Sequence, residues 1–191
     1  MPTSMSYIFC GFMGCGKSKM GVLLAKKASV PFYDLDQLIE EKANCSIAQI
    51  FAQQGEDFFR KLEEEVLFDF LDRKKLEAQD YILSLGGGAL KDQSRVFRIQ
   101  QYAPLVFIEV PFDEIYKRLI RRKTRPLLLD KSGNLKPHNE LYPFLDTLYK
   151  KRLPLYQMAE ITFSQNPSIE KEKNAQHLFS LLYTSANDSN A

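Results

Sequence analysis

The residues of this chain that are best suited to chemistry lie near its start, between Gly11 and Ser18. They form the pattern G-x-x-x-x-G-K-S, which is typical of a phosphate-binding loop. Glycines let backbone N–H groups turn toward a phosphate, and a helix that begins in the loop adds partial positive charge. We therefore predict a nucleotide site in which Lys17 contacts the β- and γ-phosphates and Ser18 binds Mg²⁺. The other predicted nucleotide contacts in and beside the loop are Gly14, Cys15, Gly16 and Lys19.

The segments on either side of this loop support the motif. A short apolar run, Tyr7–Cys10, precedes the loop and predicts a β-strand, and the amphipathic pattern of residues 19–27 predicts a helix after it. Strand, glycine loop and helix are the context that the motif requires. The alternative is a chance match in a flexible loop, and these flanking segments argue against it.

Two carboxylates, Asp34 and Asp36, follow the second apolar run of the chain. Ligands of open α/β sheets bind at the carboxyl ends of the strands. Near a phosphate loop, one carboxylate can hold Mg²⁺ through water and a second can accept the proton of a hydroxyl group. The sequence alone equally allows Asp36 to be only the N-cap of the next helix, because Asp is favoured at that position.

Three successive glycines, Gly86, Gly87 and Gly88, follow the third apolar run. Without side chains, this backbone allows a substrate to lie directly against its N–H groups. A tight turn into the next helix is the simpler explanation, but such a turn needs only one or two glycines. We therefore expect a ligand contact at this segment.

A basic run lies in the second half of the chain, where six of the nine residues from Lys117 to Arg125 are Lys or Arg. Such a run is usually a solvated helix face, and nucleic-acid binding is the next possibility. Its last residue is the informative one, because Arg125 and Pro126 end the predicted helix directly before a polar, turn-rich loop at residues 129–139. We predict that this loop belongs to a mobile lid and that Arg125 reaches the phosphates when the lid closes.

Arg60 and Arg152 are isolated arginines on predicted helices. From the residues alone, a surface salt bridge is the simpler role for each of them. Arg60 has suitable partners four residues before and four residues after it, Glu56 and Glu64.

Five apolar, β-rich runs alternate with helical patterns along the chain. This alternation predicts an α/β fold with a parallel sheet and helices on both faces. The runs cover residues 7–10, 30–33, 81–85, 105–110 and 160–163. A capping box at Ser46 and Gln49 predicts a helix that ends near Gly55, and a second helix is expected from Glu56 to about residue 75.

Length and composition limit the possible functions. The chain has 191 residues, of which 45% are hydrophobic and 26% are charged, and its net charge is +2. These values fit one soluble globular domain over residues 1–184, followed by a small polar tail at 185–191. The modest charge gives no reason to expect nucleic acid or a membrane surface as a partner.

Three cysteines, Cys10, Cys15 and Cys45, form neither a disulfide framework nor a metal-binding spacing. The N-terminus lacks a signal-peptide layout, and no apolar run is long enough to span a membrane, so we predict a cytoplasmic protein. Cys15 lies beside the predicted phosphate, where it is either a reactive thiol or, more often, a small loop residue.

Taken together, these pieces resemble shikimate kinase over nearly the whole chain. The resemblance rests on the phosphate loop with Gly21 after it and on five further motifs: Phe32-Tyr33-Asp34-Leu35-Asp36, Phe59-Arg60-Lys61-Leu62-Glu63, Leu85-Gly86-Gly87-Gly88, Arg125-Pro126-Leu127-Leu128 and Lys151-Arg152-Leu153-Pro154-Leu155-Tyr156. It implies a three-layer P-loop kinase fold with a five-stranded parallel sheet, substrate-binding helices at about residues 36–64 and a lid at about residues 118–140. It also implies transfer of the γ-phosphate of ATP to the 3-hydroxyl of shikimate, a step of aromatic amino-acid biosynthesis.

The resemblance also implies roles for individual residues. Lys17 would bind phosphate, and Ser18 and Asp34 would hold Mg²⁺. Asp36 would bind the shikimate hydroxyls and take the proton. Arg60 and Arg152 would grip the substrate carboxylate, for which arginine forks are well suited. The remaining implied contacts are Gly87, Gly88 and Glu63 for shikimate, Arg125 for the phosphates and Arg118 for the adenine. The expected partners are ATP and shikimate, and we expect a monomer.

Two segments depart from the family pattern. The stretch between Arg125 and Arg152 is longer than usual, and Ser164-Gln165-Asn166-Pro167 stands where the family often has an Asp-Thr pair near the adenine. Two other functions remain open. A related kinase acting on gluconate or a nucleoside monophosphate would share the loop and the fold but needs different acceptor contacts. A non-catalytic binding module would have no need to keep Lys17, Asp36 and Arg125.

Overall fold

The computed structural model describes residues 5–121, 126–129 and 133–188. Its centre is a sheet of five parallel strands in the order β2-β3-β1-β4-β5. The strands are β1 (Tyr7–Cys10), β2 (Phe32–Asp34), β3 (Ile82–Ser84), β4 (Leu105–Glu109) and β5 (Ile161–Ser164). Each predicted apolar run therefore coincides with a strand, with ends that differ by no more than two residues.

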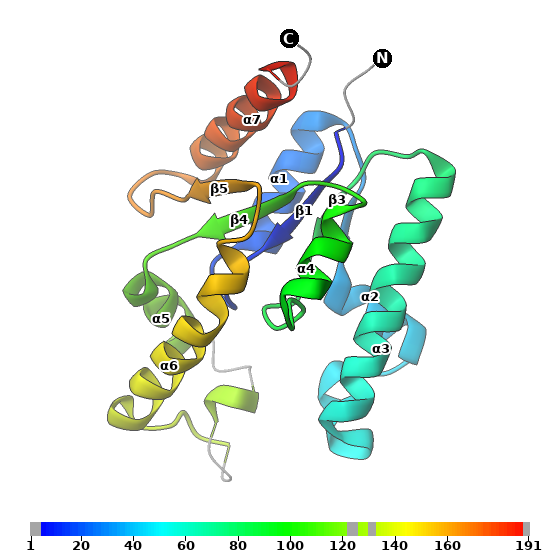
Figure 1. The fold of residues 1–191 in the computed structure, drawn as a ribbon. Helices are drawn as coiled ribbons and strands as arrows, with labels where there is room; N and C mark the ends of the chain where they lie inside the picture. Colours follow the sequence, from blue (N-terminus) through cyan, green and yellow to red (C-terminus); the bar gives the residue numbers. More distant parts are fainter. Residues whose placement is uncertain (1–4, 122–125, 130–132, 189–191) are drawn as a thin grey trace.

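Helices lie on both sides of this sheet (Figure 1). They are α1 (Lys17–Ala28), α2 (Leu35–Ala43), α3 (Ile47–Glu77), α4 (Gln93–Gln100), α5 (Phe112–Ile120), α6 (His138–Tyr156) and α7 (Lys171–Asp188), with a 3-10 turn at Pro126–Leu128. Helix α1 packs closely against α7, α2 against α3, and α5 against α6. The predicted α/β fold with a parallel sheet is confirmed.

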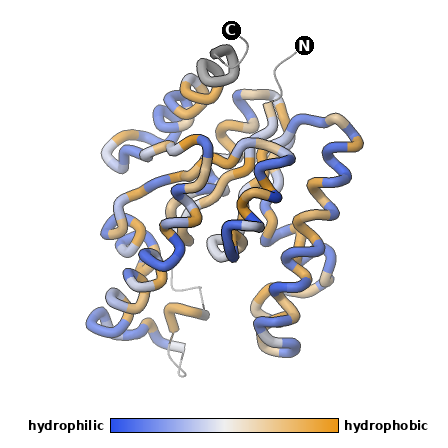
Figure 2. The backbone as a smooth tube through the Cα atoms, viewed as in Figure 1, coloured by the Kyte–Doolittle hydropathy of each residue, from blue (hydrophilic) through white to orange (hydrophobic). Residues whose placement is uncertain are grey.

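The core follows from this arrangement, because strands covered by helices on both faces are buried throughout. Every residue of β1 and β3 is buried, and one continuous apolar cluster extends from the sheet to the inner faces of the helices. Figure 2 shows the same pattern, with hydrophobic residues in the central strands and alternating hydrophobic and hydrophilic residues along the helices.

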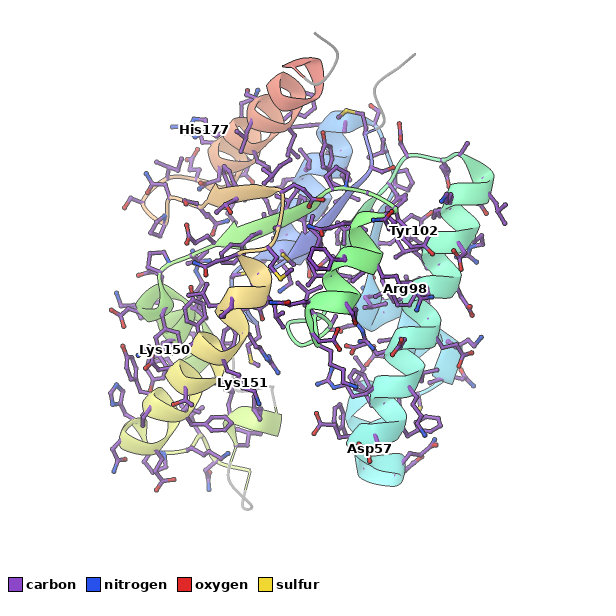
Figure 3. The ribbon with its side chains drawn as sticks, viewed as in Figure 1. Asp57, Arg98, Tyr102, Lys150, Lys151 and His177 are labelled. Atoms are coloured by element: carbon purple, nitrogen blue, oxygen red, sulfur yellow. The ribbon has the colours of Figure 1, made fainter. Side chains whose placement is uncertain are left out.

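Side chains of α4 hold the long helix α3 in place (Figure 3). The guanidinium group of Arg98 lies 3.4 Å from the centre of the Phe68 ring, and Tyr102 Oη, just after α4, donates to Asp72 Oδ1 at 2.6 Å. These contacts join α3 to the segment that follows the three glycines. They therefore fix α4 against the C-terminal half of α3.

The capping box predicted at Ser46 and Gln49 is present. The Gln49 N–H donates to Ser46 Oγ at 3.2 Å, and Gln49 Oε1 accepts from the Ser46 N–H at 2.9 Å. The predicted end of this helix near Gly55, with a second helix from Glu56, is confirmed. Gly55 has non-helical angles, φ +79° and ψ 179°, and a second helical stretch continues directly to Glu77.

The region expected to contain a lid, at about residues 118–140, is described in part, and its described residues are more regular than the sequence indicates. Leu129 pairs with Leu135 in an isolated antiparallel bridge, and the Lys136 N–H donates to the Leu128 carbonyl at 3.0 Å. Helix α6 already begins at His138, so the polar loop is shorter than expected. Residues 122–125 and 130–132, and with them Arg125, lie outside the described part of the chain.

The C-terminal helix is also longer than expected, since the polar tail predicted from residue 185 is helical up to Asp188. All three cysteines are free: Cys10 and Cys15 are buried and Cys45 is half-buried. In the part of the chain that the structure describes, no helix combines the length and the apolar character needed to cross a membrane.

Candidate active site

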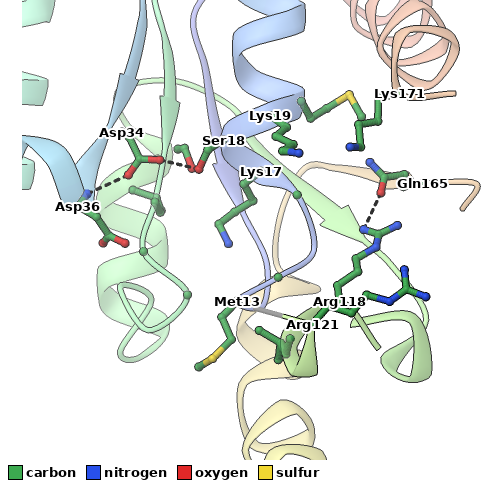
Figure 4. A pocket seen from close by; sticks show the side chains of 18 residues that line it. Met13, Lys17, Ser18, Lys19, Asp34, Asp36, Arg118, Arg121, Gln165 and Lys171 are labelled. Carbon is green, nitrogen blue, oxygen red and sulfur yellow. Dashed lines mark hydrogen bonds between the residues drawn. The ribbon is translucent and has the colours of Figure 1, made fainter. Parts of the chain in front are cut away.

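Three segments that follow parallel strands meet at one edge of the sheet. The phosphate loop follows β1, Asp34 ends β2, and the three glycines follow β3. The strands β2, β3 and β1 are neighbours, and the carboxyl ends of parallel strands lie at the same edge. The topology therefore brings these segments together, around a pocket of about 400 Å³ (Figure 4).

The phosphate loop is shaped by its glycines. Gly11, Gly14 and Gly16 have φ angles of +141°, +84° and +104°, which residues with side chains rarely adopt. Gly16 is the N-cap of α1, and among the described residues no side chain caps this helix and no acidic residue occupies its first turn. The N-terminus of α1 thus keeps its N–H groups and its partial positive charge for an anion.

Lys17 is buried, and its ammonium group is held by the loop itself. Nζ donates to the carbonyls of Gly11 at 2.8 Å and Phe12 at 3.1 Å. Charge-assisted bonds to phosphate are stronger than bonds to neutral carbonyls, so this lysine is poised to take up a phosphate. Cys15 Sγ lies 3.9 Å from Nζ and is fully buried, which fits a small loop residue better than a reactive thiol.

Asp34 connects the phosphate loop with helix α2. Its Oδ2 accepts from Ser18 Oγ at 2.6 Å, and its Oδ1 accepts from the Asp36 N–H at 3.0 Å (Figure 4). Asp34 is therefore the N-cap of α2, and the alternative that gave this role to Asp36 is wrong. Asp36 lies in the first turn, where its Oδ1 is 2.9 Å from the position that a side-chain carbon would take on Gly86. Its carboxylate thus faces the glycine turn.

The three glycines form a turn in which the Ala89 N–H donates to the Gly86 carbonyl at 3.1 Å. Other parts of the site also approach each glycine closely. A side-chain carbon on Gly87 would lie 3.0 Å from the backbone nitrogen of Met13. Backbone limits the space at Gly87, whereas Gly86 and Gly88 face the ends of the Asp36, Arg60 and Arg152 side chains, which a side chain at either glycine would displace.

Arg60 from α3 and Arg152 from α6 converge on this turn, although they are far apart in the sequence. A side-chain carbon on Gly88 would lie 3.2 Å from Arg60 Nη2 and 3.1 Å from Arg152 Nη2. Arg152 also donates to the Gly87 carbonyl at 3.0 Å. Two guanidinium groups at one turn offer several N–H donors in the planar geometry that suits a carboxylate.

The surface salt bridge expected as the simpler role of Arg60 is present in part. Arg60 Nη2 lies 3.4 Å from Glu56, whereas Glu64 pairs with Arg95 and Arg98 instead. The shorter bond of Arg60, at 2.9 Å, goes to Glu63. Arg60 therefore lies beside the glycine turn and also pairs with carboxylates of its own helix.

Glu63 is almost completely buried, with 2% of its side chain exposed, and lies between two arginines. Arg95 Nη1 is 3.9 Å from Oε2, the same carboxylate oxygen that bonds to Arg60, and Arg95 also donates to the Ala89 carbonyl at 3.2 Å. A buried carboxylate is tolerated because paired cations balance its charge. Arg95, which is itself buried, thus ties α3 to the glycine turn.

Residues from α5, α7 and the segment after β5 line the opposite end of the pocket. Arg118 Nη1 donates to the Cys15 carbonyl at 3.1 Å and to Gln165 Oε1 at 3.0 Å (Figure 4). Among the described residues, five cations and two carboxylates line the pocket: Lys17, Lys19, Arg118, Arg121 and Lys171, with Asp34 and Asp36. This excess of positive charge favours a polyphosphate ligand.

Most of the predicted site residues lie at this pocket or at the adjoining turn. Those that line the pocket are Gly14, Gly16, Lys17, Ser18, Lys19, Asp34, Asp36, Gly87 and Arg118, whereas Gly88, Arg60, Arg152 and Glu63 lie around the turn. Cys15 is buried in the loop, and Arg125 lies outside the described residues.

Sequence reasoning missed several residues of the site. Arg121 belongs to the basic run and Gln165 to the segment that departs from the family pattern, so the sequence had singled out both segments but not these two residues. Lys171 and Arg95 carried no local signal. They reach the site only because α7 and α4 pack where they do.

The pocket offers oxygen ligands for magnesium at one point. Ser18 Oγ and Asp34 Oδ2, which lie 2.6 Å apart, are the kind of donor that Mg²⁺ prefers. Among the described residues, no cluster of three or more His, Cys, Asp or Glu side chains could hold a metal. One carboxylate and one hydroxyl fit Mg²⁺, which usually keeps several waters and binds substrate phosphates as well.

Comparison with known proteins identifies the family of this chain. The family model for shikimate kinase matches residues 13–183. The chain belongs to the shikimate kinase family. A shikimate kinase of Chlorobium chlorochromatii is 39% identical over 164 residues, which cover 85% of this chain and 83% of that protein. One of Aquifex aeolicus is 34% identical over 157 residues, which cover 82% and 84%.

Solved structures of the family have the same fold. Shikimate kinase from Bacteroides thetaiotaomicron matches with a TM-score of 0.81 and 31% identity, over 94% of this chain and 98% of that chain. Shikimate kinase from Acinetobacter baumannii, solved in complex with shikimate, matches with a TM-score of 0.77 and 29% identity, over 96% of each chain. The predicted P-loop kinase fold is thereby confirmed, and shikimate kinases use ATP as their co-substrate.

Proposed function

We propose that this protein transfers the γ-phosphate of ATP to the 3-hydroxyl of shikimate, giving shikimate 3-phosphate and ADP in aromatic amino-acid biosynthesis. The observation that carries the proposal is the convergence of Arg60 and Arg152 on the glycine turn, beside Asp36 and the phosphate loop. Shikimate offers a carboxylate to the arginines and hydroxyl groups to Asp36. Membership of the family supports the same acceptor.

The nucleotide half of the site would neutralise the charge of ATP. Lys17 would exchange its bonds to the loop carbonyls for bonds to phosphate, and the N-terminus of α1 would donate N–H groups. Arg118 and Gln165 line the end of the pocket where the base would lie. Mg²⁺, when held by Ser18 and Asp34, supplies further charge neutralisation at the phosphates.

The acceptor half would orient the attacking hydroxyl group. Arg60 and Arg152 would hold the carboxylate, and the backbone of Gly87 and Gly88 would contact the ring substituents. Asp36 would accept a hydrogen bond from the 3-hydroxyl and take its proton. Phosphoryl transfer has a loose transition state, so positioning and charge neutralisation supply most of the rate, and Asp36 serves as much to orient as to deprotonate.

The proposal also covers the lid, the oligomeric state and the cellular location of the protein. We propose that Arg125, in a lid at about residues 118–140, contacts the phosphates when the lid closes and that closure excludes water. We also propose a cytoplasmic monomer with one domain over residues 1–184 that acts on small molecules, without a nucleic-acid or membrane partner. Three free cysteines suit a reducing compartment.

An ADP-release assay with ATP and Mg²⁺ tests the acceptor. Shikimate, gluconate, AMP and no acceptor are compared at equal concentrations. We expect rapid ADP release with shikimate and only background release in the other three reactions. Release with gluconate or AMP but not with shikimate would assign a different acceptor, and background release in all four would favour a non-catalytic module.

A further inference from the structure

The carbonyl group of Gly87 accepts two hydrogen bonds from side chains of helix α6. Tyr156 Oη donates to it at 2.5 Å, and Arg152 Nη1 donates to it at 3.0 Å. The two donors are four residues apart and therefore lie on the same face of the helix. One backbone oxygen of the glycine turn thus holds two side chains at the end of α6.

Tyr156 is buried and its ring is packed against the sheet. Only 2% of its surface is exposed, and its ring stacks on Phe107 of β4 with 5.5 Å between the ring centres. Burial raises the pKa of Tyr156, although Arg152 acts in the opposite direction. The hydroxyl group therefore stays protonated, and it remains a hydrogen-bond donor to Gly87 at every pH at which an enzyme would work.

The position of Arg152 depends on the same carbonyl group. Its Nη1 is held at the Gly87 carbonyl, while its Nη2 lies beside Gly88, close to the same position that Nη2 of Arg60 approaches. A shift of the Gly87 carbonyl would move the anchored nitrogen of Arg152. It would also move the Gly88 backbone, beside which both guanidinium groups lie. The two arginines that would hold the substrate carboxylate, Arg60 and Arg152, are called the carboxylate clamp below. Their relative position would change.

We propose that Tyr156 is a positioning residue for the acceptor carboxylate. Its hydroxyl group fixes the Gly87 carbonyl. Through this carbonyl it keeps Arg152 and Gly88 at the correct position relative to Arg60. The proposal rests on the proposed function, since it takes shikimate as the ligand of the two arginines. It assigns to Tyr156 a selective effect on carboxylate binding and none on the nucleotide.

The test compares two conservative variants, Tyr156→Phe and Tyr7→Phe. Tyr7 is the matched control, because it is also buried and its Oη also donates to a backbone carbonyl, that of Leu182, at 3.2 Å. Each substitution removes one oxygen atom and keeps the ring. Calorimetry gives the Kd of shikimate, of its neutral carboxamide and of ATP for each variant, and urea unfolding gives their stabilities.

For Tyr156→Phe we expect a Kd for shikimate that is higher by about threefold to tenfold, the range that corresponds to one neutral hydrogen bond. Binding of the carboxamide and of ATP should stay within about twofold of the wild type on the same scale. Tyr7→Phe should change no ligand affinity, even if it costs as much stability as Tyr156→Phe.

Two results would overturn the inference while leaving the proposed function intact. One is an unchanged Kd for shikimate in Tyr156→Phe. The other is an equal loss for shikimate and its carboxamide, which would mean a general distortion of the pocket. If the wild type itself neither binds nor phosphorylates shikimate, the proposed function fails, and this inference fails with it.

Discussion

Asp34 and Asp36 stand two residues apart and have different neighbours. Asp34 bonds to Ser18 and caps α2, whereas Asp36 faces the glycine turn. The proposed roles follow this division, with Asp34 on the side of the nucleotide and Asp36 on the side of the acceptor.

We expect Asp36→Asn to lower kcat by about 10²–10⁴-fold, the usual contribution of a general base, with an ATP affinity close to that of the wild type. Steady-state kinetics with shikimate and calorimetry with ATP measure the two quantities. Asp34→Asn is the matched control, for which we expect weaker binding of ATP in the presence of Mg²⁺. A collapse of ATP affinity in Asp36→Asn would contradict the division of roles.

The carboxylate clamp is tested by Arg60→Ala and Arg152→Ala. Each charge-assisted contact contributes about 1.5–3 kcal/mol, so either variant should weaken shikimate binding by about tenfold to more than a hundredfold. Lysine should restore little at either position, because a point charge does not reproduce the fork of arginine. Calorimetric titration with shikimate measures the effect, and titration with ATP should show almost none.

Arg98→Ala is the control for these two variants. Arg98 is a half-exposed arginine of α4 that packs against Phe68 of α3, and we expect its loss to leave shikimate affinity unchanged (Figure 3). If Arg60→Ala and Arg152→Ala bind shikimate as the control does, the clamp does not exist and only the nucleotide half of the proposal remains.

Two helices contain glycines that are required for different physical reasons. Gly21 has ordinary helical angles within α1, but a side-chain carbon there would lie 2.3 Å from Cε2 of Phe32. Gly55 has no atom within 4 Å of that position, but its φ of +79° and ψ of 179° are open almost only to glycine. Gly21 is therefore required because a larger residue would clash with Phe32, and Gly55 because other residues rarely adopt its backbone angles.

We expect Gly21→Ala and Gly55→Ala each to lower the free energy of unfolding by about 1–3 kcal/mol. Only the stability lost in Gly21→Ala should depend on the size of a neighbouring side chain. Adding Phe32→Leu should recover part of the stability of Gly21→Ala, because the smaller side chain makes room. Urea unfolding of the single and double variants measures this coupling. Simple additivity of Gly21→Ala and Phe32→Leu would rule out the steric explanation.

Buried tyrosines affect the stability of the whole molecule at high pH. Burial raises the pKa of Tyr81 to about 12 and also raises the pKa values of Tyr7 and Tyr156. Below pH 10 these groups are protonated in both the folded and the unfolded state. Above pH 10 the unfolded chain loses the protons while the folded protein keeps them, so the free energy of unfolding falls as the pH rises.

We therefore expect stability to decrease between about pH 10 and pH 12, by as much as about 1.4 kcal/mol per pH unit for each such tyrosine. Urea unfolding at several pH values measures the slope, and tyrosinate absorbance measures ionisation. The absorbance of the buried tyrosines should appear only with unfolding. Full ionisation of all tyrosines in a protein that remains folded would contradict this expectation.

Much of this architecture could be predicted from local patterns. The strands, the capping box at Ser46 and the phosphate loop depend on neighbours in the sequence, and the structure confirms them. The N-cap considered from the sequence was Asp36, whereas the structure gives this role to Asp34, because α2 begins two residues earlier than the sequence indicates. The contacts of Arg95, Lys171 and Tyr156 could not be predicted either, since they depend on how distant helices pack.

The junction from Asp34 to Asp36 has a consequence for how the length of this chain can change in evolution. Three consecutive residues end a strand, cap a helix and present the carboxylate that faces the acceptor side. One inserted residue would turn Asp36 by about 100° around the helix axis and move it by about 1.5 Å. No loop lies between the strand and the helix to absorb such a change. Insertions and deletions must therefore accumulate elsewhere, for example in the connection before α6.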